Sequence, residues 1–271
     1  MKTILITGST DGIGKLTAIQ LAKEGHKVYI HGRNKQKLEN TVTEIKQISN
    51  NNYIESFLAD FSDLKSVQQM ASEVNAKLPQ LDVLINNAGI FKNSVTKNNN
   101  DIDIRLVVNY LAPFVLTKNL IQLLRKSEHS RIINLSSAAQ ATVSINALQG
   151  NSLLSVQDAY SQSKLALTMW SFYLALQYPK IVIIAVNPGS LLNTKMANEA
   201  YGTHWASADK GVTILHDLAV AEKYKGITGK YFDNDKGDPI GSFANAHSDA
   251  YNHEKIDALI ATTEKLINDI L

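Results

Sequence analysis

Short runs of β-branched and other apolar residues alternate with longer segments of helical periodicity from the first residues to about residue 187. This alternation predicts repeated βαβ units around a parallel sheet. We therefore predict an α/β fold with a doubly wound parallel sheet of about seven strands, flanked by helices in three αβα layers. The expected strands are residues 3–7, 27–31, 53–59, 81–86, 131–136 and 181–187, and the expected helices are residues 13–22, 38–48, 64–78, 102–124 and 158–178.

The whole chain, residues 1–271, is predicted to form a single domain. Chains of about 250 residues with this alternation routinely fold as one unit, and no linker-like segment interrupts this one. The first residues contain no apolar run as long as that of a signal peptide, and no stretch approaches the roughly 18 apolar residues of a membrane span. We therefore expect no membrane span.

Charge and cysteine content narrow the possible partners. The chain has 27 basic and 25 acidic residues without a long basic run, which disfavours nucleic acid and anionic membrane surfaces. It has no cysteine, which excludes disulfides, a thiolate nucleophile and cysteine-ligated metals. We expect a small-molecule partner, no metal site and a cytoplasmic location.

Three glycines, Gly8, Gly12 and Gly14, lie between the first predicted strand and the first predicted helix. In that place glycines let the backbone approach a pyrophosphate, and the helix N-terminus supplies free N–H groups. A plain turn is the simpler alternative. A P-loop is excluded, because Gly8 lies six residues before Gly14 instead of five and Leu16 stands where a magnesium-binding Ser or Thr is needed.

Tyr160 and Lys164 are four residues apart on a predicted helix, so their side chains lie on one face and can meet at one site. An ammonium close to a phenol favours the phenolate, and lowering a phenol pKa from near 10 to neutral pH requires roughly 4 kcal/mol. Such a tyrosine could exchange a proton at neutral pH. For an isolated pair, the alternative is a surface tyrosine packed along a lysine stem.

Five segments occur in an order that resembles one enzyme family. They are TGSTDGIG at 7–14, NNAG at 86–89, INLSS at 133–137, YSQSK at 160–164 and NPG at 187–189. They extend over nearly the whole chain and resemble the short-chain dehydrogenase/reductase family. The 22 residues between Ser137 and Tyr160 are similar to the longer connection of its retinol-dehydrogenase-like members. The resemblance implies a Rossmann-like fold and hydride transfer between a nicotinamide cofactor and a substrate.

The resemblance also implies four catalytic residues. Tyr160 would be the acid/base, and Lys164 would lower its pKa and hold the nicotinamide ribose. Ser137 would polarise the substrate carbonyl, since the second serine of the pair at 136 and 137 is the family's usual catalytic one. Asn109 would hold a proton-relay water, with an ordinary polar helix residue as the alternative.

The resemblance further implies a set of cofactor-binding residues. Asp60 is similar to the acid that contacts the adenine, with a helix N-cap as the alternative. The NNAG segment is similar to the one beside the adenosine ribose, and the alternative is a plain strand end. Thr194, expected near the carboxamide, comes late, because four residues separate it from the Pro-Gly pair. The full set is Gly8, Ser9, Thr10, Gly12, Ile13, Gly14, Arg33, Asp60, Asn86, Ala88, Gly89, Tyr160, Lys164, Pro188, Gly189 and Thr194.

The end of the second predicted strand bears on the choice of nicotinamide cofactor. An NAD enzyme is expected to carry an acid there for the ribose 2′-hydroxyl, whereas an arginine accommodates a 2′-phosphate. Gly32 occupies the expected acid position, and Arg33 follows it. We predict NADP (NADPH) in preference to NAD, with Asp11 in the first loop as a countervailing negative charge.

Two segments are expected to shape the substrate pocket, residues 138–156 and residues 191–207. Both are moderately apolar and lack a basic cluster, which favours a small, mainly apolar aldehyde, ketone or alcohol. We expect a substrate lid at about 190–208, then a last strand and turn at 229–235, and a C-terminal helical tail from about residue 253. Lid side chains that could line the pocket, or only pack, are Met196, Tyr201, His204 and Trp205.

Other functions are weighed against hydride transfer. A non-catalytic NAD(P)-binding sensor or scaffold would share the fold, although all four catalytic residue types are present. A sugar-nucleotide epimerase or dehydratase is disfavoured, because its glycine spacing differs and it needs a larger C-terminal substrate domain.

The family resemblance also implies a homodimer or homotetramer, in which the helices carrying Asn109 and Tyr160 pair across subunits. The apolar residues that could supply this surface, or else the chain's own core, are Leu165, Leu167, Met169, Trp170 and Leu174.

Overall fold

The computed structural model describes residues 1–237 and 241–271, without the side chains of residues 200 and 201. Within this part, eight strands form one sheet in the order β3-β2-β1-β4-β5-β6-β7-β8, and only β7 and β8 pair antiparallel. The chain runs from β1 out to β3 and then crosses to β4 on the other side of β1, which is the doubly wound topology. The strands are β1 (Thr3–Ile6), β2 (Lys27–Gly32), β3 (Ile54–Leu58), β4 (Val83–Asn86), β5 (Arg131–Leu135), β6 (Val182–Asn187), β7 (Lys230–Asp233) and β8 (Ser242–Ala244).

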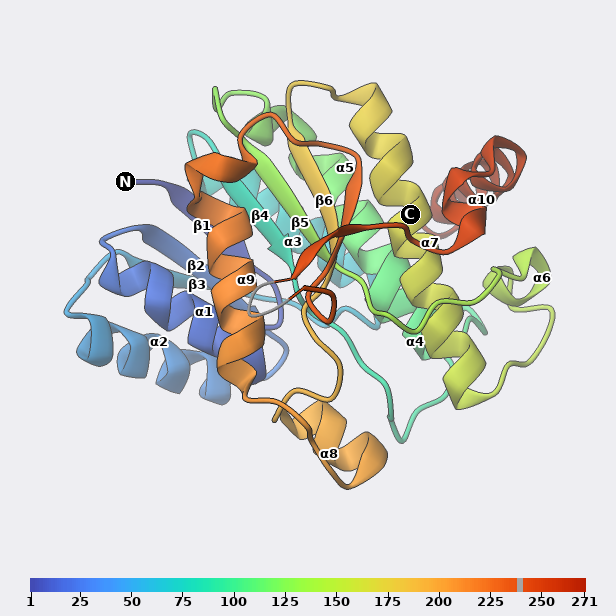
Figure 1. Ribbon diagram of the computed structural model, residues 1–271, viewed down its shortest axis with the longest axis horizontal. Coiled ribbons are helices and arrows are strands. Elements are labelled where there is room, and N and C mark those ends of the chain that lie inside the picture. Colours follow the sequence, from blue (N-terminus) through green and yellow to red (C-terminus); the bar gives the residue numbers. More distant parts are fainter. Residues whose placement is uncertain (238–240) are drawn as a thin grey trace.

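Helices cover both faces of the sheet and form the three layers visible in Figure 1. α1 (Gly12–Lys23), α2 (Lys35–Ser49) and α9 (Ala208–Val220) pack on one face, and α3 (Leu64–Lys77), α5 (Ala112–Leu124) and α7 (Val156–Gln177) pack on the other. Every residue of β4, β5 and β6 is buried, as expected for central strands covered on both sides. The remaining helices are α4 (Ile104–Leu106), α6 (Ile145–Leu148), α8 (Lys195–Tyr201) and α10 (His253–Ile270).

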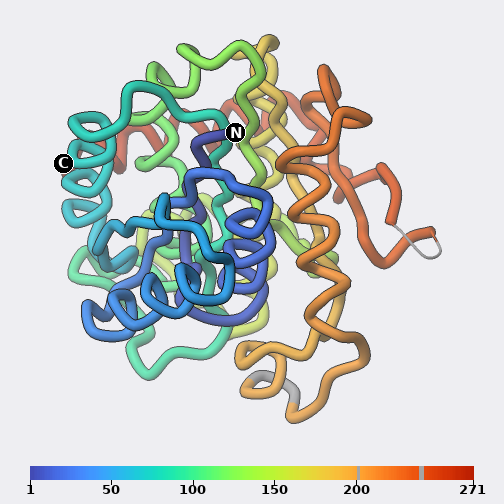
Figure 2. The backbone as a smooth tube through the Cα atoms, turned by 90° about the vertical axis from the view of Figure 1, so that its left-hand side faces the viewer, coloured from blue at the N-terminus to red at the C-terminus, as the bar shows by residue number. Residues whose placement is uncertain are grey.

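The predicted fold class is confirmed, and most of the differences lie after residue 187. Before it, the short helix α6 was not predicted, and a π-helical turn, Val107–Leu111, interrupts the long helix expected at 102–124. β8 is an additional antiparallel edge strand of three residues, too short to show a period of two in the sequence. α9 lies beyond the alternation on which the prediction rests. The start of α8 lies apart from the layers, at the lower edge of Figure 1, and projects from the body of the molecule in Figure 2.

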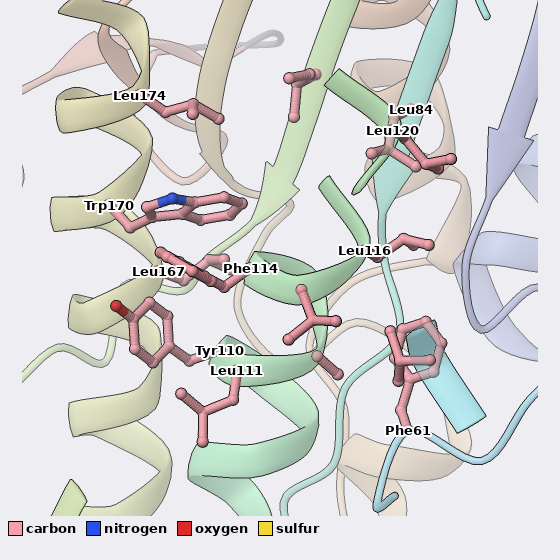
Figure 3. Close-up of a cluster of buried hydrophobic side chains, with 14 of the residues drawn as sticks. Phe61, Leu84, Tyr110, Leu111, Phe114, Leu116, Leu120, Leu167, Trp170 and Leu174 are labelled. Atoms are coloured by element: carbon pink, nitrogen blue, oxygen red, sulfur yellow. The ribbon is translucent and has the colours of Figure 1, made fainter. Parts of the chain in front are cut away.

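One helix of the described residues, Ile104–Leu124, is long and apolar enough to cross a membrane by length and composition. In the fold, however, 83% of its apolar window is buried. Figure 3 shows its side chains between α7 and the sheet, with Phe114 beside Trp170 and Leu120 beside Leu84. The ring centroids of Phe114 and Trp170 are 5.4 Å apart. Packing in the core therefore accounts for the apolar character of this helix.

The apolar residues of α7 belong to the chain's own core. Leu165, Leu167, Met169, Trp170 and Leu174 are between 0% and 8% exposed. α10 closes this side, since its Leu259 and Ile260 join the same cluster, and the Thr263 hydroxyl lies 2.8 Å from the Tyr110 hydroxyl. These residues offer no apolar surface to a second subunit, and the expected homo-oligomer therefore depends on the family resemblance alone.

Candidate active site

The glycine turn connects β1 to α1 and packs directly against the end of β4. Gly8 and Gly12 have positive φ angles of 62° and 53°, which glycine adopts without steric cost. A Cβ atom on Gly8 would lie 2.7 Å from the Ala88 Cα, so a side chain there would collide with backbone. α1 then begins at Gly12, with Asp11 as its N-cap. The first N–H groups of a helix have no partner within the helix and attract anions, so this turn can hold a phosphate group.

Asn87 fastens the glycine turn to β4. Its Nδ2 donates to the carbonyls of Thr7 at 2.8 Å and Gly8 at 2.9 Å. The Thr7 hydroxyl in turn accepts from the Asn87 and Ala88 amides. Asn86 instead points into the core, where its Nδ2 donates to Asn134 Oδ1 at 2.8 Å. Within the NNAG segment, the side chain that serves the turn is therefore Asn87, which the sequence prediction did not include.

The side chain of Ser9 is also structural. It is fully buried, donates to the Ile6 carbonyl at 2.7 Å and accepts from the His31 amide at 2.9 Å. These two hydrogen bonds join the end of β1 to β2. Of the predicted turn residues, Ser9 could therefore meet a cofactor through its backbone only.

His31 is a buried supporting residue that the sequence prediction missed. Its Nδ1 accepts from the Gly8 amide at 3.0 Å, so its Nε2 carries the proton and donates to the Ala59 carbonyl at 3.1 Å. Burial lowers the pKa of His31 to about 4, which agrees with a neutral ring. No local pattern marks this role, because its two side-chain partners, Gly8 and Ala59, follow two other strands, β1 and β3.

Acidification should therefore destabilise the protein through His31. Because the pKa of His31 is about 4 in the fold and near 6.5 when unfolded, its neutral form contributes stability at pH 7. That contribution, about 3 kcal/mol, is lost as the pH falls from 6.5 to 4. Urea unfolding of the protein and of His31→Asn at pH 7 and pH 4 measures it. The stability difference between the two proteins should shrink on acidification, and a constant difference would contradict this account.

Tyr160 and Lys164 meet on α7, at the carboxyl ends of β4 and β5. The Lys164 Nζ lies 5.6 Å from the centre of the Tyr160 ring and donates to the Leu135 carbonyl at 2.7 Å. Lys164 is 5% exposed, and burial lowers its pKa to about 8. A Cβ on Gly89 would lie 3.5 Å from the Lys164 Nζ. The Lys164 ammonium therefore lies close to Gly89 as well as to the Tyr160 ring.

Asn109 lies in a π-helical turn, Val107–Leu111, between α4 and α5. Such turns interrupt α-helices frequently at functional sites. Its Oδ1 accepts from the Ile90 amide at 2.8 Å, and its Nδ2 donates to the Ile90 carbonyl and to Ser163 Oγ, each at 3.0 Å. Ser163 Oγ donates to the Tyr160 carbonyl at 2.6 Å. Asn109 thus joins the loop after β4 to the helix that carries Tyr160.

The two serines at the end of β5 differ in their surroundings. Ser136 is 3% exposed, and its hydroxyl bonds to the Lys164 carbonyl at 3.0 Å and to Thr168 Oγ1 at 2.7 Å. Ser137 is partly exposed, and its Oγ accepts from the Ala139 amide at 3.1 Å. Its carbonyl accepts from the Tyr231 hydroxyl. The geometry favours Ser137 as the serine that can reach a substrate.

Arg33 and Asp60, the two predicted residues that follow β2 and β3, are both exposed. Arg33 follows β2 and forms no ion pair with any described residue. Asp60 Oδ1 accepts from the Ser62 amide at 2.9 Å. The N-cap of α3 is Asp63, so capping does not explain Asp60.

The segment after β6 crosses back over the glycine turn. Gly189 has a φ of 123°, and the Pro188 carbonyl accepts from Asn234 Nδ2 at 2.8 Å. Thr194 is the N-cap of α8, and its Cγ2 would lie 3.8 Å from a Cβ on Gly12. Its side chain therefore lies against the start of α1, so the lid begins directly above the candidate phosphate site.

The lid side chains differ in exposure. Trp205 is 76% exposed and Met196 is 37% exposed. His204 Nδ1 lies 3.2 Å from Asn198 Oδ1, and the side chain of Tyr201 lies outside the described residues. From the loop after β4, the Lys92 Nζ donates to the Glu199 carbonyl at 3.0 Å. The lid thus spans from the glycine turn to the loop after β4.

The residues present fit a nicotinamide dinucleotide. Gly8 and Gly12 carry no side chains, so the turn leaves backbone N–H groups accessible at a helix N-terminus. A Cβ on Gly89 would lie within 3.5 Å of both Asn109 Oδ1 and Lys164 Nζ. In open α/β sheets, ligands bind outside the carboxyl ends of the strands where the strand order reverses, here between β1 and β4.

Comparisons with known proteins identify the family of this chain. The model of the short chain dehydrogenase family matches residues 2–204. Retinol dehydrogenase 12 from Bos taurus is 34% identical over 252 residues, which cover 87% of this chain and 78% of that protein. Polyprenol dehydrogenase from Homo sapiens is 30% identical over 259 residues, which cover 87% and 77%.

Solved structures share the fold. A short chain dehydrogenase from Shigella flexneri 2a str. 301, complexed with NADP, is 26% identical with a TM-score of 0.71, and the match covers 86% of this chain and 96% of that one. An uncharacterized protein from Mycobacterium paratuberculosis has a TM-score of 0.80 at 24% identity, with 98% and 93% covered. The chain therefore belongs to the short-chain dehydrogenase/reductase family of oxidoreductases, in its retinol-dehydrogenase-like branch.

Proposed function

We propose that this protein is an NADP-dependent oxidoreductase that transfers a hydride between the nicotinamide and a carbonyl or alcohol group of a small, mainly apolar substrate. The observation that carries the proposal is the convergence of Tyr160, Lys164 and Asn109 at Gly89, beside the glycine turn. An acid/base pair and a phosphate-binding turn within one cleft are what nicotinamide-dependent carbonyl chemistry requires.

Each residue has a role in the proposed reaction. When bound, the nicotinamide supplies or accepts the hydride. Tyr160 gives a proton to the substrate oxygen during reduction and takes it back during oxidation. Lys164, whose pKa of about 8 keeps it mainly protonated at pH 7, favours the phenolate and holds the nicotinamide ribose. Ser137 donates a hydrogen bond to the substrate oxygen, and Asn109 holds the relay water.

Two contacts favour NADP over NAD. A Cβ on Gly32 would lie 2.5 Å from Thr10 Cγ2, so an acid at this position, where NAD enzymes carry one, would require the Thr10 side chain to move. The Lys37 Nζ lies 2.7 Å from Asp11 Oδ2, and its hydrogen bond lowers the pKa of Asp11. Asp11 is thus paired with a cation, which weakens its repulsion of a 2′-phosphate, and Arg33 is left to bind that group.

Arg33→Ala should therefore change the cofactor preference. Losing one charge-assisted contact with a phosphate is expected to raise the KM for NADPH about 10- to 100-fold. The KM for NADH should change less than about twofold, because NADH has no 2′-phosphate. Arg125→Ala, at an exposed arginine on the far end of α5, is the control. Initial rates with NADH that match those with NADPH in the unmodified protein would refute the NADP assignment.

The substrate class is proposed from the lid side chains and from the relatives. The names of the two relatives describe dehydrogenases of retinol and polyprenol, both apolar alcohols. The lid adds exposed apolar side chains at Met196 and Trp205. We propose apolar aldehydes, ketones and alcohols as substrates of this protein. A panel of these compounds, followed by NADPH absorbance in reduction and oxidation, tests the proposal, and no turnover with any member would reject it.

The alternative function is a non-catalytic NAD(P)-binding sensor or scaffold. It predicts that NADPH quenches tryptophan fluorescence while no carbonyl in the panel is reduced. The presence of all four catalytic residue types argues against it, because a degenerate cofactor binder is expected to have lost at least one of them. A homodimer or homotetramer and a cytoplasmic location are retained as proposals that rest on the family resemblance and on the cysteine-free composition.

A further inference from the structure

Asp235 lies in the turn after β7, outside the catalytic cluster, and its carboxylate accepts several hydrogen bonds. Both Oδ atoms lie 3.0 Å from the Ser190 amide. Oδ2 also accepts from Ser190 Oγ at 2.5 Å and from Asn187 Nδ2 at 2.8 Å. On the opposite side, the Lys210 Nζ lies 3.5 Å from Oδ1. The side chain of Asp235 remains 32% exposed.

These partners belong to the two ends of the lid. Asn187 ends β6 and Ser190 is the first lid residue, whereas Lys210 lies in the first turn of α9, directly behind the lid. Asp233 takes part as well, since its Oδ1 accepts from Asn187 Nδ2 and from the Asp235 amide. A single carboxylate therefore connects the segment that enters the lid with the helix that leaves it.

The lid itself is closed at its base. Leu192 and Ala206 form a parallel β-bridge, the Asn193 amide donates to the Ala206 carbonyl at 2.8 Å, and the Trp205 amide donates to the Leu191 carbonyl at 2.9 Å. Leu191 has a positive φ of 46°, an uncommon conformation for a branched residue. Because the two arms are hydrogen-bonded together, anchoring Ser190 also sets the position of Thr194 over Gly12.

We propose that Asp235 is a positioning residue that holds the substrate lid in its closed place above the cofactor turn. The inference rests on the proposed function for the identity of the cleft, but its geometry is independent of turnover. An amide in place of the carboxylate keeps the shape, yet it carries one acceptor oxygen instead of two and turns an NH₂ group toward Ser190 donors. The charged hydrogen bonds are lost, and the lid opens more often.

Asp235→Asn tests this inference by hydrogen exchange, which requires no substrate. The amides of Ser190, Asn193 and Trp205 should exchange about tenfold faster or more, since each lost charged hydrogen bond shifts the local opening equilibrium by roughly that factor. Amides of β5 and β6 should be unchanged. Asp257→Asn, which removes the same charge from an exposed residue of α10, should leave the lid as it is.

Kinetics with an active substrate provide a second measurement. If only a fraction of molecules has the lid in place, the KM for the carbonyl should rise about tenfold, while kcat falls less than about threefold. Ser190→Ala removes only the hydroxyl that donates to Asp235. It should therefore raise both the lid exchange rates and the KM for the carbonyl, each by less than Asp235→Asn does. If Asp235→Asn fails to fold, Ser190→Ala carries the test by itself.

Unchanged lid exchange in a folded Asp235→Asn protein overturns the proposal, and so does a KM within twofold of the unmodified value. Failure of the proposed function has a different signature. In that case no substrate turns over in any variant, and the exchange comparison still decides the role of Asp235.

Discussion

Tyr160→Phe should lower kcat for carbonyl reduction by about 10²- to 10⁴-fold, the usual contribution of a positioned general acid. The change removes the phenol oxygen and keeps the ring, whose edge-to-face contact with Phe91 at 5.0 Å preserves the local packing. Lys164 still donates to the Leu135 carbonyl. Affinity for NADPH should consequently stay within about threefold, because the glycine turn supplies the phosphate contacts.

Stopped-flow reduction and fluorescence titration with NADPH separate the two effects of this variant. Tyr173→Phe is the matched control, since it removes a phenol oxygen from the same helix, α7. It should retain full activity. Turnover above one-tenth of the unmodified rate in Tyr160→Phe would remove Tyr160 from the mechanism.

Lys164→Met should abolish detectable reduction and at the same time make the cofactor-free protein more stable at pH 7. Burial lowers the pKa of Lys164 to about 8, so holding it protonated at pH 7 costs about 3 kcal/mol relative to the unfolded chain. Methionine is of similar length and carries no charge. The gain is reduced by the Leu135 carbonyl, which loses its 2.7 Å donor.

The pH dependence distinguishes this cost from ordinary packing. The unfolded lysine binds its proton more tightly than the folded one, so between pH 8 and 10.5 the unfolded state holds more protons. The stability of the unmodified protein should therefore rise with pH in that window relative to Lys164→Met. Urea unfolding at pH 7 and pH 10 measures the difference, with Lys65→Met, at an exposed residue of α3, as the control. Parallel stabilities at both pH values would show that the burial of Lys164 carries no such cost.

The sequence predicted the parts of the fold that depend on local patterns. Strand-helix alternation predicted the doubly wound sheet, and the strand at 131–136 agrees with β5 to within one residue. The long helix expected at 102–124 is present, but a π-helical turn interrupts it at Asn109. Every residue from Ile104 to Thr117 is buried, so the extra residue of the π-helical turn shifts no boundary between an apolar and a polar face, and the feature that orients Asn109 could not be predicted.

The candidate site shows the same difference between features that local patterns predict and features that they do not. Gly8, Gly12, Tyr160 and Lys164 lie in short motifs whose spacing itself brings them to a strand end or one helix face, and in the structure all four lie at the same edge of the sheet. Asn86 and Asn87 are adjacent and identical in type, yet one is a core residue and the other holds the turn. Which of them faces Gly8 depends on how β4 is oriented in the sheet, since successive side chains along a strand point to opposite sides.

What the sequence by itself determined is the family, the fold class and the residues within each motif, because hydrophobic period and glycine spacing act over a few residues. The tertiary structure decided which residues support them. His31 reaches Gly8 from another strand, and Asp235 reaches Ser190 across 45 residues of chain. Such contacts form only when separate strands end at the same edge of the sheet, and no local pattern records where distant strand ends meet.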